Sequence, residues 1–389
     1  MLKKILALTL CLIMGAAFVA CTQTGDGDTN SGNNPTITGT NQSNTNTETD
    51  SESNKTESNG ATVEMTTWDE TMEHKFLATD VANAAVIVVD LGLSQKDDFS
   101  DLENCITWEW RSGKDPTCKG NPGKGIDAAK LRYSPYYKRD VVVACSSSGW
   151  AGVVDYEAET PCVLWEWSFA GGNFHSIEMM PNGDVVIAGS GDDGKLFYVP
   201  LSAGSTSPSH YISSPSGHGV MYDPKNDWLW VLDYDEVFAC TVKGAGTKDA
   251  KLARIGGCEV KFVHDQDGHV LSPKFGEPGK YWVANSTRNY LFDTETMTFS
   301  YAPSHYTNSR NSATKELGIK GIAYYPDRTM IMIVANTGEV SAEHFSEYIR
   351  IVRIMPLGGK LQGTKPSTVN VPIYGREFYK VYPLNKNYQ

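Results

Sequence analysis

Three of the eight histidines in this 389-residue chain stand at one repeated position. Successive segments each open with a short apolar run that ends in a turn residue, usually proline, and we counted six residues back from that turn. The positions reached, in chain order, are Ala129, His175, His218, His269, Lys320 and Glu377. Imidazoles brought together by rigid strands can hold a divalent transition metal, or act as acid and base near neutral pH.

A plainer interpretation competes with this one. At a wet, polar surface, histidines can satisfy nearby backbone groups or hold water without binding any ligand. The metal hypothesis, with His175, His218 and His269 as ligands, also lacks a carboxylate with an obvious place beside them. The sequence therefore leaves a ligand site, a divalent metal site and a purely local role open.

Further polar residues fall in the turns between the second and third strands of the segments, which we expect to share a face with the histidines. These residues are Asp80, Asn83, Ser147, Trp150, Asp192, Asp193, Asn285, Arg288 and Asn336. Trp150 is suited to stacking on a sugar ring, although packing inside the fold would explain it equally well. The "GSGDDG" segment lacks the spacing of a calcium loop, so we interpret it as a turn.

Short strands with alternating patterning must position these residues, because helical periodicity is almost absent. The first strands end at Pro135, Pro181, Pro224, Phe275 and Pro326, between 43 and 51 residues apart. Each segment holds four such strands, which is typical of a propeller blade. The sequence predicts an all-β fold, a single β-propeller of six four-stranded blades over residues 73–389. A parallel α/β fold lacks helical crossovers here, whereas a ring of five or seven blades stays open.

The first blade lacks an inner strand of its own. It begins with "KFLATDV" and "AAVIVVDL", which match second and third strands. The segment "REFYKVYPLN" near the C-terminus matches a first strand ending at Pro383. We therefore expect the C-terminal strand to complete blade one and close the ring, which removes an unpaired sheet edge.

A Trp-Glu-Trp strand occurs twice, as "ITWEW" at 106–110 and "VLWEW" at 163–167. We assign both copies to outer, fourth strands. Alternation along a strand puts Trp108 and Trp110 on one face and Glu109 on the other. The pattern predicts packing against a neighbouring blade rather than chemistry.

The N-terminus has the features of an export signal, with Lys3 and Lys4 before an apolar run that stops at Cys21. "FVAC" resembles a bacterial lipobox, which implies a signal peptide over 1–20 and a lipid such as palmitate on Cys21. An ordinary secretory signal is the alternative. Residues 21–72 are rich in Ser, Thr, Asn and Asp and predict a disordered tether. We expect a lipoprotein of the cell envelope, anchored to a membrane on its periplasmic or outer side.

Charge and cysteine content narrow the possible partners. The formal net charge is −12 and no Lys/Arg-rich run occurs, which argues against nucleic acid as a partner. We expect a monomer. Of the six cysteines beyond Cys21, Cys118 and Cys145 lie where they could meet, whereas Cys145–Cys162 and Cys240–Cys258 should be too far apart to bond.

Segments "ATDVANAAVIVVD", "AGGNFHSIEMMPNGDVV", "GHGVMYDPKNDWLWVL" and "DGHVLSPKFGEPGKYWV" resemble a family of uncharacterised secreted six-bladed propellers, a domain of unknown function common in gut Bacteroidales. The resemblance covers almost all of 75–384 and implies the fold but no established activity. A weaker likeness to quinoprotein-type repeats, in "GVVDYEAETPCVLWEW", implies shared blade packing only.

Three functions are consistent with these features. The first is a binding module that takes a glycan or other small ligand at the histidine-bearing face. The second is an enzyme, a metal-assisted carbohydrate lyase or hydrolase that uses His175, His218 and His269. The third is a protein–protein scaffold. The candidate ligand-binding residues are His175, His218, His269, Lys320, Glu377, Trp150, Asp80, Asn285 and Arg288.

Overall fold

The computed structural model describes residues 74–389 except 124, 192, 263–265, 286–287, 304–317, 336–345 and 354–366. The chain divides into a unit over Met1–Ser58 and a second over Asn59–Gln389, and every described residue belongs to the second. The predicted signal peptide, Cys21 and the tether lie outside the described residues, as do Asp192 and Asn336.

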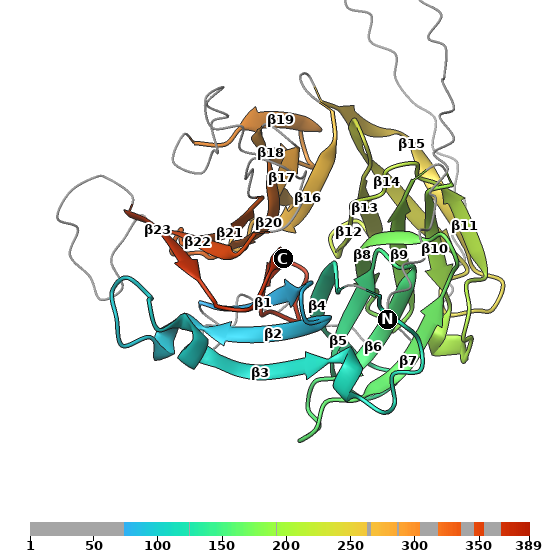
Figure 1. Cartoon of the computed structure of the whole chain (residues 1–389). Coiled ribbons are helices and arrows are strands. Elements are labelled where there is room, and N and C mark those ends of the chain that lie inside the picture. Colours follow the sequence, from blue (N-terminus) through green and yellow to red (C-terminus); the bar gives the residue numbers. More distant parts are fainter. Residues whose placement is uncertain are drawn as a thin grey trace, which may run out of the picture. The chain divides into compact units, whose positions relative to one another are not determined.

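Six four-stranded antiparallel sheets form the blades of a β-propeller, as the sequence predicts (Figure 1). Each is given from its inner to its outer strand. Blade one is β24 (Phe378–Pro383), β1 (Lys75–Asp80), β2 (Ala85–Asp90) and β3 (Ile106–Arg111), and blade two is β4 (Ala128–Ser134), β5 (Arg139–Ser146), β6 (Trp150–Asp155) and β7 (Val163–Ser168). Blade three is β8 (Asn173–Met179), β9 (Val185–Ser190), β10 (Lys195–Val199) and β11 (His210–Ser213), and blade four is β12 (Gly219–Asp223), β13 (Trp228–Leu232), β14 (Glu236–Lys243) and β15 (Lys251–Lys261). Blade five is β16 (Gly268–Pro273), β17 (Lys280–Asn285), β18 (Asn289–Asp293) and β19 (Thr298–Tyr301), and blade six is β20 (Ile319–Tyr324), β21 (Met330–Val334), β22 (Tyr348–Arg353) and β23 (Ser367–Pro372).

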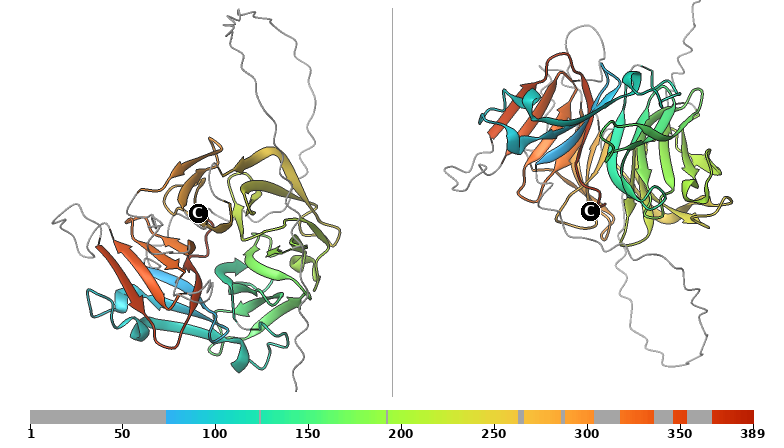
Figure 2. Two further views of the ribbon diagram at one scale, coloured as in Figure 1. Left: turned by 45° about the horizontal axis from the view of Figure 1, so that its top comes forward. Right: turned by 90° about the horizontal axis from the view of Figure 1, so that it is seen from below.

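The C-terminal strand closes the ring. β24 pairs antiparallel with β1, with Val381 opposite Ala78 and Tyr382 opposite Leu77, and so supplies the inner strand of blade one. Each inner strand contacts the next around the axis, in the order β4, β8, β12, β16, β20, β24 and back to β4. The left view of Figure 2 shows the blades around this axis, with the C-terminus near the centre. The predicted closure is confirmed.

The apolar core is divided among the interfaces between blades. Runs of β-branched residues such as "AVIVVD" in β2 are buried on both faces, because each middle strand packs against blades on both sides. The buried apolar side chains form six clusters, one for each pair of neighbouring blades, including the pair of blade six with blade one. The ring is thus held by side-chain packing around its whole circumference.

The repeated Trp-Glu-Trp strands lie in β3 and β7, the outer strands of blades one and two. Trp110 is buried and stacks on Trp150 of the next blade, with ring centroids 5.7 Å apart. The Glu166 carboxylate accepts hydrogen bonds from the Trp150 indole and from the backbone N–H of Lys119 and Gly120. The glutamate therefore fixes the connection between the two blades, and the repeat serves packing.

Helix is confined to single turns in the described residues: η2 (Leu91–Leu93), η3 (Leu102–Cys105), η4 (Ser112–Lys114) and η5 (Leu201–Ala203). None of the helices in this part of the chain is long and apolar enough to cross a membrane. The six described cysteines are all free thiols, so Cys118 and Cys145 are not joined.

Candidate functional site

Five of the inner strands carry one extra residue near their start. In β8, β16 and β20 the register against the second strand shifts by one at His175, His269 and Lys320. In β12 the N–H of His218 bonds to the carbonyl of Leu232, which already faces Gly219. In β4, Asp127 and Ala128 share Cys145 in the same way. Such β-bulges change the direction in which a side chain points.

Blade one has a similar bulge in β24. Its register shift falls between Phe378 and Val381 and so includes Tyr379 and Lys380. All six blades therefore contribute a polar residue at the same end of the ring axis. We call this set the mouth cluster; its members are Asp127, His175, His218, His269, Lys320, Tyr379 and Lys380.

Contacts run through the mouth cluster from blade to blade. The rings of His175 and His218 stack, with centroids 4.4 Å apart and planes 10° from parallel. His218 meets His269 edge to face at 5.1 Å. Nε2 of His269 lies 2.5 Å from Nζ of Lys320. On the other side, Oη of Tyr379 lies 3.5 Å from Nδ1 of His175. The three predicted histidines thus come together at one place.

Lys380 ties the cluster together from blade one. Its Nζ donates to the carbonyl oxygens of His175, at 2.8 Å, and His218, at 2.6 Å. The side chain is buried, as is that of Lys320, which is only 2% exposed. Buried lysines are rare in proteins unless an acid or several acceptors compensate the charge. Two of them at one end of the ring is therefore an observation that packing alone does not explain.

Burial dominates the protonation equilibria of the cluster. It lowers the pKa of His218 to about 3 and that of His269 to about 4, where hydrogen bonding to Asp267 opposes the effect. Burial also lowers the pKa of His175 well below its usual range, with His218 and Lys380 adding to the shift. The three imidazoles are therefore neutral at neutral pH, which is the form that can stack face to face.

The pKa values of the lysines and the aspartate in the cluster are also shifted so that the neutral form is favoured. Burial lowers the pKa of Lys320 to about 8 and that of Lys380 to about 7, because a buried ammonium loses its hydration. Burial raises the pKa of Asp127 to about 7, against the hydrogen bond from the N–H of Ser147. Ionisable groups with such shifts gather preferentially at functional sites.

The ring geometry does not suit a metal centre. A metal ligand uses the lone pair in the plane of the imidazole. The two stacked rings hold their lone pairs in nearly parallel planes, with centroids 4.4 Å apart, so these lone pairs do not converge on one point. Nε2 of His269 already contacts Lys320 and Asp267. No group of three or more His, Cys, Asp or Glu side chains in the described part of the chain is arranged to hold a metal ion.

The remaining candidate residues have other surroundings. From the order of the blades we expected Lys320 and Glu377 to lie across the axis from the three histidines. Lys320 instead lies beside His269. Glu377 precedes the bulge of β24, and its carbonyl accepts the N–H of Val81, so Tyr379 and Lys380 represent blade one in the cluster. Trp150 is buried between blades one and two and is not presented as a stacking surface.

Asp80, Asn285 and Arg288 stabilise loops. The Asp80 carboxylate is buried and accepts from Nη1 of Arg376 at 2.8 Å. The side-chain oxygen of Asn285 accepts the N–H of Arg288 at 2.8 Å. The Arg288 guanidinium lies over the ring of Tyr301, 5.3 Å from its centroid. None of these contacts involves the mouth cluster.

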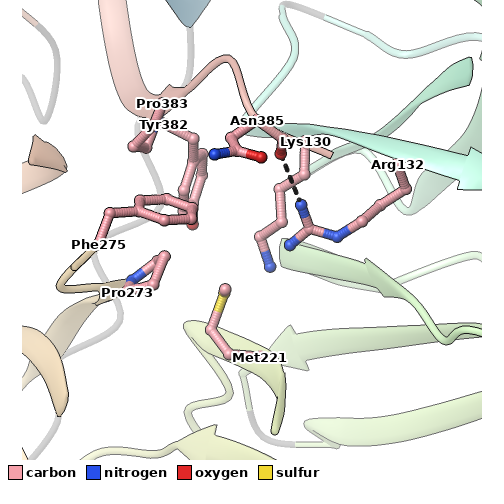
Figure 3. A pocket seen from close by; sticks show the side chains of 8 residues that line it. All are labelled: Lys130, Arg132, Met221, Pro273, Phe275, Tyr382, Pro383 and Asn385. Carbon is pink, nitrogen blue, oxygen red and sulfur yellow. Dashed lines mark hydrogen bonds between the residues drawn. The ribbon is translucent and has the colours of Figure 1, made fainter. Parts of the chain in front are cut away.

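A second polar layer lies deeper along the inner strands. The buried carboxylate of Glu178 in β8 pairs with Arg132 at 2.6 Å and with Lys130 at 3.3 Å, both from β4. Beside this layer is a cavity of about 10 Å³, close to what one water molecule needs (Figure 3). It is lined by Lys130, Arg132, Met221, Pro273, Phe275, Tyr382, Pro383 and Asn385.

The segment after β24 contacts several blades around this layer. Nη1 of Arg132 donates to the carbonyl of Asn385, as Figure 3 shows, and its guanidinium lies 4.6 Å from the centroid of the Tyr388 ring. Oη of Tyr388 donates to the carbonyl of Met179. The side-chain oxygen of Gln389 accepts the N–H of Gly279. These residues link blades two, three and five.

Sequence reasoning missed Asp127, Tyr379 and Lys380, together with the layer formed by Lys130, Arg132 and Glu178. A signal for most of them was present, because a charged residue inside an otherwise buried inner strand is unusual. Lys130, Glu178, Lys320 and Lys380 all meet that description. Counting from the turn reached the wrong residue in blade one because Pro383 lies inside β24, opposite Phe76, whereas Pro181 follows the end of β8.

Comparison with known proteins adds the fold alone. No protein-family model matches the chain, and no curated protein matches it. Among solved structures, a protein of unknown function from Bacteroides caccae is 11% identical over 80% of this chain and 98% of its own, with a TM-score of 0.48. A functionally unknown protein from Desulfotomaculum acetoxidans is 12% identical over 79% of this chain and 84% of its own, with a TM-score of 0.44. The family resemblance expected from the sequence stays a prediction.

Proposed function

We propose that this protein is a binding module that takes a small polar ligand, a glycan or a molecule of similar chemistry, at the mouth cluster. The observation that supports it most is the convergence of polar side chains from all six inner strands at one end of the ring. Binding sites typically combine a rigid frame with a few convergent polar groups of shifted pKa.

Stability alone gives no reason for this arrangement. Replacing a buried ionic cluster by apolar side chains of similar volume is often neutral or stabilising. Two buried lysines and three neutral histidines, placed on bulges, cost desolvation energy that a purely structural ring would avoid. A ligand that supplies acceptors for these groups would offset that cost.

An exposed aromatic residue near the cluster favours a ligand with a ring. Tyr234 is 45% exposed in the turn between β13 and β14. Its carbonyl accepts the N–H of Asp267 and of Gly268, which directly precede His269. The Tyr234 turn is therefore fixed next to the mouth cluster, and a tyrosine face is a suitable surface for stacking on a sugar ring.

A scaffold function has less support. The large apolar residues that are exposed in the described residues, such as Tyr133, Tyr211, Tyr301 and Tyr348, come from different blades. Scattered exposed side chains of this kind are normal for a soluble surface and do not define an interface.

The binding function is tested with His175→Ala, His218→Ala and His269→Ala. A screen against an array of neutral and acidic oligosaccharides should identify ligands of the unmodified protein, and each variant should bind them at least roughly tenfold more weakly, because truncation leaves the other anchors unpaired. His210→Ala, in the outer strand β11, is the matched control and should bind normally. Three variants with unchanged binding and unchanged thermal midpoints would contradict the proposal.

We also propose that the propeller is held in the cell envelope by a lipid on Cys21. The support is the lipobox-like "FVAC" sequence with the apolar run before it. The full chain expressed in a bacterium should incorporate a palmitate analogue and sediment with membranes, and Cys21→Ala should abolish both. Export of an unlipidated protein cut elsewhere would favour the ordinary secretory signal.

A further inference from the structure

Lys320 makes fewer hydrogen bonds than Lys380, the other buried lysine of the mouth cluster. It is the bulged residue of β20 and is only 2% exposed, so its ammonium group has lost most of its hydration. Its one hydrogen bond within the described residues is with Nε2 of His269 at 2.5 Å. An ammonium has three N–H donors, and a buried donor without an acceptor is costly.

The atom that Lys320 contacts, Nε2 of His269, also has a second partner. The Oδ2 atom of Asp267 lies 2.9 Å from the same Nε2 atom of His269. A carboxylate there needs a proton on Nε2, whereas an ammonium needs the lone pair of Nε2. A single ring nitrogen cannot serve both. When Nε2 donates its proton to Asp267, the Lys320 ammonium is left without an acceptor.

The other charged groups nearby do not relieve Lys320. Lys380 is a second cation, and it bonds to main-chain carbonyls. Asp127 lies on the side of His175, where Oδ1 is 3.7 Å from Nδ1 and Oδ2 accepts the N–H of Ser147. Glu178 is occupied by Arg132 and Lys130 in the deeper layer. Among the described residues, Asp267 is the anion that favours the charged form of Lys320, and its carboxylate is already in contact with His269.

We propose that the ligand of the mouth cluster carries a carboxylate group, and that Lys320 binds it while His269 keeps its hydrogen bond to Asp267. This inference rests on the proposed binding function. It assigns the ligand to acidic molecules, such as a uronic acid or another small carboxylate, rather than to neutral sugars. A carboxylate fits because it offers several lone pairs to one ammonium and compensates its charge.

Isothermal titration calorimetry of the full chain with matched pairs tests the proposal. D-galacturonate is compared with D-galactose and D-glucuronate with D-glucose, while succinate serves as a carboxylate without a sugar ring. We expect each acid to bind roughly tenfold to a hundredfold more tightly than its neutral partner, which is the usual range for a hydrogen bond to a charged group. Succinate binding as tightly as the uronates would assign the ligand to small carboxylates in general.

Two variants complete the design. Lys320→Met removes the charge at similar length and should abolish the preference for acids over their neutral partners. Lys243→Met, at the exposed end of β14, should keep the preference. The comparison within the unmodified protein does not depend on either variant folding.

The outcomes separate the two proposals. Neutral sugars that bind as well as acids, with binding lost in His218→Ala, would overturn the carboxylate inference and leave the binding function standing. No binding of any member of the panel, with no binding on the oligosaccharide array either, would overturn both. A preference for acids that survives in a folded Lys320→Met variant would exclude Lys320 as the anchor.

Discussion

The histidines of the mouth cluster stay neutral in the folded protein, whereas in the unfolded chain they gain protons below about pH 6.5. A histidine whose pKa is lowered by folding does not reduce the stability of the protein when the pH is above its unfolded pKa, because it is neutral in both states. Its contribution to stability is lost as the pH falls from about 6.5 toward its folded value, because the unfolded state then binds more protons. For His218 that value is about 3, so the loss covers the whole mildly acidic range.

The resulting prediction concerns the variant His218→Asn, which removes the titrating group and keeps a polar side chain. Between pH 6.5 and 4.5, the unmodified protein should lose on the order of 2 kcal/mol of stability through this histidine. The thermal midpoint of the variant should therefore fall less steeply over this range. Scans at pH 7.5, where the imidazole is neutral in both states, give the reference for each protein.

Asp127 acts in the opposite direction and must be included in the comparison. Its folded pKa is raised to about 7, so its contribution is present at low pH and is lost as the pH rises from about 4 to 7. Lys320 and Lys380 have folded pKa values of about 8 and about 7. Their contributions to stability are therefore lost in a higher pH range, as the pH falls from about 10.5 toward these values. Equal slopes for the variant and the unmodified protein would mean that His218 is protonated in the fold or accessible to water.

Part of the residue-scale site follows from the sequence. The turn-counting rule found His175, His218, His269 and Lys320, because four consecutive blades keep the same distance from bulge to turn. It could not find Lys380 or Asp127, since that distance differs in blades one and two. The sequence also could not show whether Trp150 is exposed. A tryptophan at the start of β6 can face solvent or a neighbouring blade, and Trp150 is buried because Trp110 of blade one stacks on it.

At the scale of the element, the inner strands must approach one another closely to complete the ring. Gly321 in β20 lies where blade six meets β24. A Cβ atom at this position would lie 2.5 Å from the backbone nitrogen of Val381 and 2.9 Å from Cα of Lys380. Both neighbours are main-chain atoms, so they cannot rotate away as a side chain would.

Gly321→Ala should therefore separate β20 from β24 and destabilise the protein. Overpacking of this kind usually costs about 1–3 kcal/mol. The thermal midpoint should fall, and ligand binding should weaken with it, because Lys320 and Lys380 lie on the two strands that move apart. Gly256→Ala is the matched control, since nothing lies within 4 Å of a Cβ built there. An unchanged midpoint for Gly321→Ala would show that the strands can separate without cost.

The link between blades one and two depends on Glu166 in β7. Its carboxylate accepts the indole N–H of Trp150 at 2.9 Å and two backbone N–H groups of the preceding connection. Glu166→Ala leaves these donors without their acceptor, which should cost about 1–3 kcal/mol. Glu259→Ala, at an exposed position of β15, should have little effect. If the thermal midpoints of Glu166→Ala and Glu259→Ala fall equally, the hydrogen bonds of Glu166 do not stabilise the link between the blades.

At the scale of the whole molecule, the fold was more predictable than the site. The spacing of the turns, the four strands per segment and the C-terminal segment that matched an inner strand all reflect one repeated unit, so the evidence accumulates over six copies. The mouth cluster depends on a bulge of one residue in each inner strand, and nothing in the strand pattern of "NFHSIEM" or "GHVLSP" marks the residue that bulges.

Closure of the ring by β24 gives the last prediction, which compares two truncations. Removing residues 377–389 leaves blade one without its inner strand, exposes the edge of β1 and removes Tyr379 and Lys380. Removing only residues 386–389 keeps β24 and loses the contacts of Lys386 with Asp140, of Tyr388 with Met179 and of Gln389 with Gly279. The two changes separate closure of the sheet from the anchoring of the tail.

The longer truncation should lose its cooperative thermal transition and self-associate, because an unpaired edge strand pairs with other chains. The shorter one should stay monomeric, with a midpoint lowered by a few degrees through loss of the buried Tyr388 ring. Calorimetry and light scattering after size-exclusion chromatography measure both properties. If the longer truncation stays monomeric and keeps its midpoint within about two degrees of the full chain, packing between the blades maintains the ring and β24 serves chiefly to carry Lys380 into the mouth cluster.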